Sequence, residues 1–168
     1  MNLFGKHSFN NLEDLLHEQI ADLYDAERRL CDALPKMASA ASSPQLKDAF
    51  NSHLSETKTQ VQRLESVFEL LGKKPERETC DAMRGLISEG EEMVEAKGDA
   101  NVRDAALIAA AQRVEHYEMA GYGSARSFAA QIGRDDIASI LQETLEEEKA
   151  ADSKLTSIAE AGVNVAAC

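Results

Sequence analysis

Residues that interrupt helices are rare in this chain and stand in a few short stretches. Its 168 residues include three prolines and nine glycines. Tryptophan is absent, and β-branched and aromatic residues never form the alternating runs that are typical of strands. Between the interruptions, apolar residues recur at the spacing of one helix face. The pattern predicts an all-α protein with its prolines and glycines at helix ends. The expected helices cover residues 11–40, 44–71, 79–96, 101–132 and 135–161.

The connections between these helices restrict the topology. The turns before Pro44 and after Gly133 are short, so the first two and the last two helices should each form an antiparallel hairpin. The segment between the hairpins holds only a short helix and is long enough to cross the bundle. We therefore expect a ferritin-like four-helix bundle with one long crossover that carries a short extra helix. The prediction is a single domain over residues 1–168, with hairpins at 11–71 and 101–162 and the crossover at 72–100.

Charge and composition exclude several classes of protein. With 30 acidic and 18 basic residues the net charge is −12, which opposes binding to nucleic acid or to an anionic membrane surface. No apolar run is long enough to span a bilayer, and the first residues lack the apolar core of a signal peptide. Three scattered cysteines favour reduced thiols in a cytoplasmic protein. Nucleophile motifs and glycine-rich phosphate loops are absent.

Acidic residues lie on or beside the apolar stripe of each long helix. Glu27 lies at the margin of its stripe, Glu56 just off one side, and Glu115 and Glu148 near the centre of theirs. Burying a lone carboxylate is costly, and clustered carboxylates repel one another unless cations lie between them. The alternative is that acid-rich helices simply turn some glutamates partly inward. The predicted metal ligands are Glu27, His53, Glu56, Glu115, Glu118 and Glu148, with Asp152 as a further inward acid.

Four stretches of the sequence resemble a known family. ERRL, HLSET, RDAALIAAAQRVEHYEMAGYG and LQETLEEEKAADSKL are similar to the YciE/YciF family of bacterial stress proteins, within the ferritin-like superfamily of rubrerythrins and manganese catalases. The resemblance covers nearly the whole chain. It implies a ferritin-like bundle, a homodimer, and a superfamily-type ligand set. In that set Glu27 and Glu115 are the single carboxylates of their helices, and Glu56 and Glu148 the carboxylates of the other two.

The superfamily pattern is incomplete here. It places a histidine three residues after the second and fourth carboxylates, where this chain has Thr59 and Ala151. His53 stands one turn before Glu56 instead, and is as compatible with a hydrogen-bonded core histidine as with a ligand. A site with few nitrogen ligands favours hard ions, so we expect iron or manganese, two ions in number, with magnesium as a further possibility.

Two functions remain open from the sequence. The first is a metal-binding stress protein without established turnover, in which any metal is structural and the function is exercised through the dimer surface. The second is a metal-dependent oxidoreductase that acts on peroxide, oxygen or ferrous iron. We expect His116 to lie on the helix surface or behind the ligands, and Cys31 to be a buried, inert thiol, while His7 and His17 have no assigned role.

Overall fold

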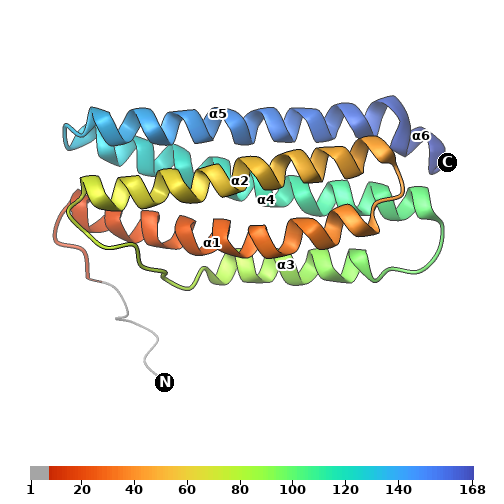
Figure 1. The fold of residues 1–168 in the computed structure, drawn as a ribbon, viewed down its shortest axis with the longest axis horizontal. Coiled ribbons are helices and arrows are strands. Elements are labelled where there is room, and N and C mark those ends of the chain that lie inside the picture. The colour runs from red at the N-terminus through yellow and green to blue at the C-terminus, as the bar shows by residue number, and fades with distance from the viewer. Residues whose placement is uncertain (1–7) are drawn as a thin grey trace, which may run out of the picture.

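The protein is described by a computed structural model over residues 8–168; residues 1–7, His7 among them, lie outside the described part. Four long helices lie side by side and a shorter one runs along their outside (Figure 1). Within residues 8–168 there is no strand, as the all-α prediction requires. The elements are α1 (Leu12–Ala40), α2 (Pro44–Leu70), α3 (Asp81–Val94), α4 (Ala100–Gln131), α5 (Asp135–Ile158), η1 (Ala159–Val163) and α6 (Asn164–Ala166).

Local sequence signals define most helix ends. The side chain of Asn11 accepts a hydrogen bond from the Asp14 backbone at the start of α1. At the start of α2, Ser43 caps the helix and Pro44 occupies its first position, where a missing N–H costs nothing. Gly72 and Gly133 follow α2 and α4 with positive φ angles of 66° and 76°, which glycine adopts without strain.

The two hairpins start from opposite ends of the bundle, as the length of the crossover predicts. Helix α2 ends at one end of the bundle, and α4 begins at the other (Figure 1). Asp104, near the start of α4, accepts hydrogen bonds from the backbone N–H groups of Ser42 (2.8 Å) and Ser43 (2.6 Å) in the α1–α2 turn. This buried carboxylate therefore fixes the beginning of the second hairpin against the turn of the first.

A second buried carboxylate holds the crossover against α1. Asp25 accepts hydrogen bonds from Arg29 (2.6 Å), from Arg77 (2.8 Å) and from the backbone N–H of Cys80 (2.9 Å), the residue that caps α3. Burial alone would raise the pKa of Asp25, but these donors outweigh it and hold the pKa below its usual range. Helix α3 packs from there against α1 and α4.

Two details differ from the sequence prediction. Prolines and glycines do not all mark helix ends, because Pro35 lies inside α1, and Gly121 and Gly123 lie inside α4. Pro35 removes one backbone hydrogen bond, and the helix continues through the buried Leu34 and Met37. The last helix does not end near residue 161, since the chain passes Gly162 in one π-helical turn and stays helical to Ala166.

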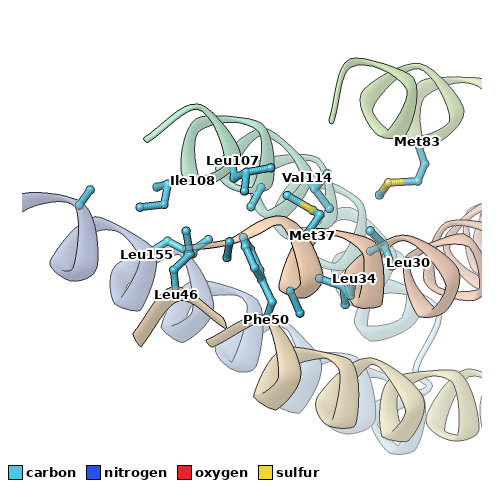
Figure 2. Close-up of a cluster of buried hydrophobic side chains, with 14 of the residues drawn as sticks. Leu30, Leu34, Met37, Leu46, Phe50, Met83, Leu107, Ile108, Val114 and Leu155 are labelled. Atoms are coloured by element: carbon cyan, nitrogen blue, oxygen red, sulfur yellow. The ribbon is translucent and has the colours of Figure 1, made fainter. Parts of the chain in front are cut away.

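The apolar core is divided into two halves along the bundle. One half includes Leu34, Met37, Phe50, Ile108 and Leu155 (Figure 2), and the other is built around Leu16, Leu64, Phe68, Tyr122 and Leu141. On each long helix the residues between the two halves include buried polar side chains. The bundle therefore has a polar layer near its middle, flanked by apolar packing on both sides.

Candidate metal centre

Every long helix contributes to the polar layer. Its members share near-complete burial, with the highest exposed fraction, 6%, at His53. They are Glu27 from α1, His53, Thr57 and Gln60 from α2, Glu115 and Glu118 from α4, and Thr144 and Glu148 from α5. The i, i+3 and i+4 spacings within α2 and α4 place these side chains on the same inward face of each helix.

Four of these residues form one compact cluster. His53 Nε2 lies 3.4 Å from Glu115 Oε1 and 3.8 Å from Glu148 Oε2. One ligand atom from each of His53, Glu115, Glu118 and Glu148 lies within 4.8 Å of all the others. Imidazole nitrogen and carboxylate oxygens gathered at this spacing can hold a metal ion.

Glu27 lies beside this cluster and is held by a tyrosine. The hydroxyl of Tyr122, fully buried on α4, donates a 2.5 Å hydrogen bond to Glu27 Oε1. Burial and the charge of Glu148 raise the pKa of Glu27 well above its usual value. The second oxygen of Glu27 has no partner.

The other buried carboxyl groups are perturbed in the same direction. Burial raises the pKa of Glu115 and Glu118 well above the usual value. The neighbouring Glu148 raises the pKa of Glu115 further, and the charge of Glu27 raises the pKa of Glu118 further. Burial also raises the pKa of Glu148, where contacts with Glu115, His53 and Gln60 oppose the rise. Four acids this close cannot all be ionised unless positive charge lies among them.

Unpartnered polar atoms are concentrated in this layer. Among the described residues, eight of the eleven buried side-chain nitrogen and oxygen atoms without a hydrogen-bond partner belong to it. Each such atom costs about 1–3 kcal/mol when it is left unsatisfied. The eight atoms are Glu27 Oε2, His53 Nε2, Thr57 Oγ1, Gln60 Oε1, Glu115 Oε2, Glu118 Oε1, Glu118 Oε2 and Glu148 Oε2. Seven oxygens and one imidazole nitrogen are a donor set that suits a hard divalent cation.

Glu56 lies on the outer side of His53. Its Oε2 is 3.4 Å from His53 Nδ1, whereas Nε2 of the same ring faces Glu115, and the Glu56 side chain is 44% exposed. The hydrogen bond with His53 lowers the pKa of Glu56. Of the six predicted ligands, the structure thus places four in one cluster and Glu27 next to it. Glu56 lies outside the cluster, on the opposite side of the His53 ring. Thr59, at the position of a superfamily histidine, is exposed.

Gln60 belongs to the layer and was not among the predicted residues. Its Nε2 donates hydrogen bonds to Glu148 Oε1 and, at 3.1 Å, to Glu147 Oε2. Arg63 in turn binds both oxygens of Glu147, at 2.5 and 2.8 Å. The sequence did contain a signal, because positions 53, 57, 60 and 64 follow one helical stripe.

The remaining candidates lie outside the cluster. The side chain of His116 is 67% exposed, with Nε2 3.4 Å from Asp152 Oδ1, and so lies on the surface as predicted. The Asp152 carboxylate also accepts a hydrogen bond from Gln112. Cys31 is only half-buried, and burial followed by the charge of Glu27 raises the pKa of its thiol, which keeps it in the unreactive neutral form.

Comparison with known proteins assigns the family. Residues 11–168 match the sequence profile of a family described as a domain of unknown function, DUF892. The chain belongs to the DUF892 family. It is 47% identical over 158 residues to protein YciF of Escherichia coli K12, a match that covers 94% of this chain and 95% of YciF. The resemblance to the YciE/YciF family is thereby confirmed.

Three solved structures have the same architecture. The crystal structure of the E. coli stress protein YciF matches with a TM-score of 0.89 at 47% identity, covering 93% of this chain and 99% of that one. YcfI of Rhodopseudomonas palustris, for which a structural role is suggested, matches with a TM-score of 0.87 at 44% identity over 92% and 98% of the two chains. A protein of Xanthomonas campestris, 23% identical with a TM-score of 0.70, shares the fold. These matches confirm the all-α bundle.

Among the described residues, no helix combines the length and the apolar composition that crossing a bilayer requires.

Proposed function

We propose that this protein is a metal-binding stress-response protein whose polar layer holds iron or manganese. The stress role rests on its similarity to the stress protein YciF. The observation that carries the metal proposal is the set of eight unpartnered buried atoms contributed by four helices. A protein gains no stability by burying so many unsatisfied groups at one level, whereas a cation would satisfy them together.

The donor set fits two ions. His53, Glu115, Glu118 and Glu148 would hold the first. Both oxygens of Glu118 and Oε2 of Glu27 have no hydrogen-bond partner, so these two carboxylates would share in holding a second. With one imidazole and several carboxylates, the site favours Mn²⁺ or Fe²⁺ and also accommodates Mg²⁺.

The surrounding residues have separate tasks. A bound ion supplies Lewis-acid chemistry and, when it is iron or manganese, electron exchange. Tyr122 orients Glu27 by donating to Oε1, and Gln60 orients Glu148 in the same way, with Arg63 and Glu147 behind it. Second partners of this kind fix the direction in which a carboxylate presents its free oxygen.

An oxidoreductase acting on peroxide, oxygen or ferrous iron is the second candidate. A hollow of about 140 Å³ that is lined by His53 and Glu115 favours it. Thr59 and Ala151, in place of the two superfamily histidines, favour the non-catalytic candidate, because they leave His53 as the one nitrogen ligand of the cluster. In the non-catalytic protein, the metal would stabilise the packing of the four helices.

Metal analysis of protein purified without chelator tests the proposal. We expect up to two equivalents of iron or manganese per chain, and a large loss in the Glu115→Ala and Glu148→Ala variants. Glu146→Ala is the matched control, since Glu146 is exposed on the same helix as Glu148 and contacts Gln142 and Lys149. A metal content below one equivalent per chain that is the same in the wild-type protein and in these variants would contradict the proposal. Peroxide consumption by the loaded protein then distinguishes the enzyme from the non-catalytic protein.

The homodimer and the cytoplasmic location stay predictions. Sedimentation equilibrium of the purified protein measures the first, and fractionation of the source cells measures the second.

A further inference from the structure

A hollow in the surface lies between α2 and α5 and ends at the proposed metal centre. Its volume is about 140 Å³. His53 and Glu115, both buried, form its inner end, while Glu56 and Lys154 lie at its more exposed rim. The hollow therefore connects solvent with two members of the four-residue cluster.

The walls of the hollow are apolar and are kept apart by small side chains. Phe50 on α2 and Leu155 on α5, both labelled in Figure 2, contribute apolar surface. Ala49, Ala150 and Ala151 provide the remaining wall, and each ends at a single methyl group. Ala151 lines the hollow together with His53 and Glu115, and its single methyl group leaves space next to the cluster.

The two residues at the inner end of the hollow each have a buried atom without a hydrogen-bond partner. His53 Nε2 and Glu115 Oε2 are buried and make no hydrogen bond. The same two residues belong to the cluster that can hold an ion. A molecule in the hollow would therefore contact two of the residues that would hold the ion.

The rim favours neither sign of charge. Lys154 lies close enough to Glu56 to contribute to the lowered pKa of that carboxyl, so one positive and one negative group stand together. The Glu147 carboxylate, also at the rim, is bound by Arg63. Apolar walls would strip water from an ion at high cost. The hollow is also well below the roughly 300–1,000 Å³ of pockets for drug-sized ligands.

We propose that this hollow is the access route and binding place for a small uncharged ligand of the bound metal, of the size of dioxygen. The proposal rests on the proposed function, because it supplies that metal. Small size follows from the volume, and lack of charge follows from the apolar walls and the balanced rim. Ala151 is the residue whose enlargement would close the route.

Nitric oxide is the probe, because it is small and uncharged and coordinates ferrous iron without needing an oxidant or a reductant. The protein is loaded with Fe²⁺ under anaerobic conditions, and the association of nitric oxide is followed by stopped-flow absorbance. We expect Ala151→Leu to slow association by about tenfold or more at unchanged iron content, because the ligand must wait for the side chain to move. Ala120→Leu, the same change on an exposed position of α4, should leave the rate unchanged.

Equal association rates in the wild-type protein and Ala151→Leu, at equal iron content, would overturn the proposal. If Ala151→Leu itself lowers the iron content, the association rate of nitric oxide is compared between the wild-type protein and Ala150→Leu. Ala150 also lines the hollow but is exposed, so its enlargement does not strain the core. Equal rates would again overturn the proposal.

A second measurement does not depend on metal. Xenon binds in small apolar cavities, so crystals of the wild-type protein under xenon pressure should show xenon in the hollow, and crystals of Ala151→Leu should not. If the wild-type protein takes up no iron, the proposed function fails, and xenon alone decides whether the hollow receives small uncharged molecules. Absence of xenon from the wild-type hollow would then overturn this proposal as well.

Discussion

The side-chain amide of Gln60 donates a hydrogen bond to Oε1 of Glu148 and leaves Oε2 of that carboxylate without a partner. The free oxygen is the one that lies 3.8 Å from His53 Nε2, inside the four-residue cluster. Gln60 is therefore a positioning residue, and it determines which oxygen Glu148 presents.

Replacing Gln60 should weaken metal binding without removing a cluster ligand. We expect Gln60→Leu to lower the affinity for Mn²⁺ by about 10–100-fold, the usual effect of losing a residue that orients a ligand. Competition with a metal-sensitive chelator measures this affinity. The matched control is Gln62→Leu, which makes the same change on an exposed position of α2. Equal affinities in the two variants would show that Gln60 has no orienting role.

The stability of the metal-free protein should depend on pH with an unusual sign. The folded-state pKa values of Glu27, Glu115, Glu118 and Glu148 are raised above their usual 4.5. Above pH 4.5 the folded state therefore holds more protons than the unfolded state, and the free energy of unfolding falls as the pH rises towards the raised values. Stability from these groups is present at low pH and is lost on going to neutral and alkaline pH.

Thermal unfolding with and without metal checks this sign. After treatment with a chelator, the Tm should be higher near pH 5.5 than near pH 8. Adding Mn²⁺ should raise the Tm most at the higher pH, because metal binding displaces the protons. A metal-free protein whose Tm rises steadily from pH 5.5 to pH 8 would contradict the raised pKa values of these carboxyl groups.

Removing one buried charge should stabilise the metal-free protein and weaken its response to metal. Glu118 is fully buried, both its oxygens lack partners, and Gln has nearly the same shape as a protonated Glu. We expect Glu118→Gln to raise the Tm of the metal-free protein at pH 8 by about 2–4 °C for each kcal/mol gained. The same variant should lose one of two bound ions, measured by titration calorimetry. A lower metal-free Tm with unchanged ion stoichiometry would exclude the proposed role of Glu118.

Two glycines in α4 should respond in opposite ways to alanine. A Cβ at Gly121 would lie 2.8 Å from Cδ2 of the buried Leu23, so Gly121→Ala should displace the Leu23 side chain and cost about 1–3 kcal/mol through overpacking. A Cβ at Gly123 would meet nothing within 4 Å, and Gly123→Ala should stabilise the helix by about 0.5–1 kcal/mol. Urea unfolding of both variants measures the difference, and a stabilising Gly121→Ala would show that the Leu23 side chain can move aside without loss of packing.

The sequence predicted the helices and their order better than the depth of individual side chains. Short turns and one long crossover leave few topologies, so the hairpins at the two ends could be derived. The burial of Glu27 and Glu56 could not be derived, because both lie at the margin of their apolar stripes. In the structure Glu27 is fully buried, whereas the side chain of Glu56 is 44% exposed. Helical periodicity fixes angles within one helix, whereas the rotation of that helix against its neighbours depends on packing across the bundle.

Pro35 and Gly121 show a second limit. Each is a helix breaker by local preference and lies inside a helix here. Packing across the bundle tolerates both: Pro35 is itself exposed while Leu34 and Met37 beside it are buried, and Gly121 leaves the space that the Leu23 side chain of α1 fills. Such contacts between distant segments are not visible in the local sequence.

Anomalous diffraction from crystals grown with Mn²⁺ would locate any ion held inside the bundle. We expect peaks in the polar layer, the first within coordinating distance of His53, Glu115, Glu118 and Glu148 and the second beside Glu27 and Glu118, and we expect both to be lost in Glu115→Ala. Manganese bound only at exposed carboxylates such as Glu146, or no peak within the bundle at saturating Mn²⁺, would contradict the proposed metal centre.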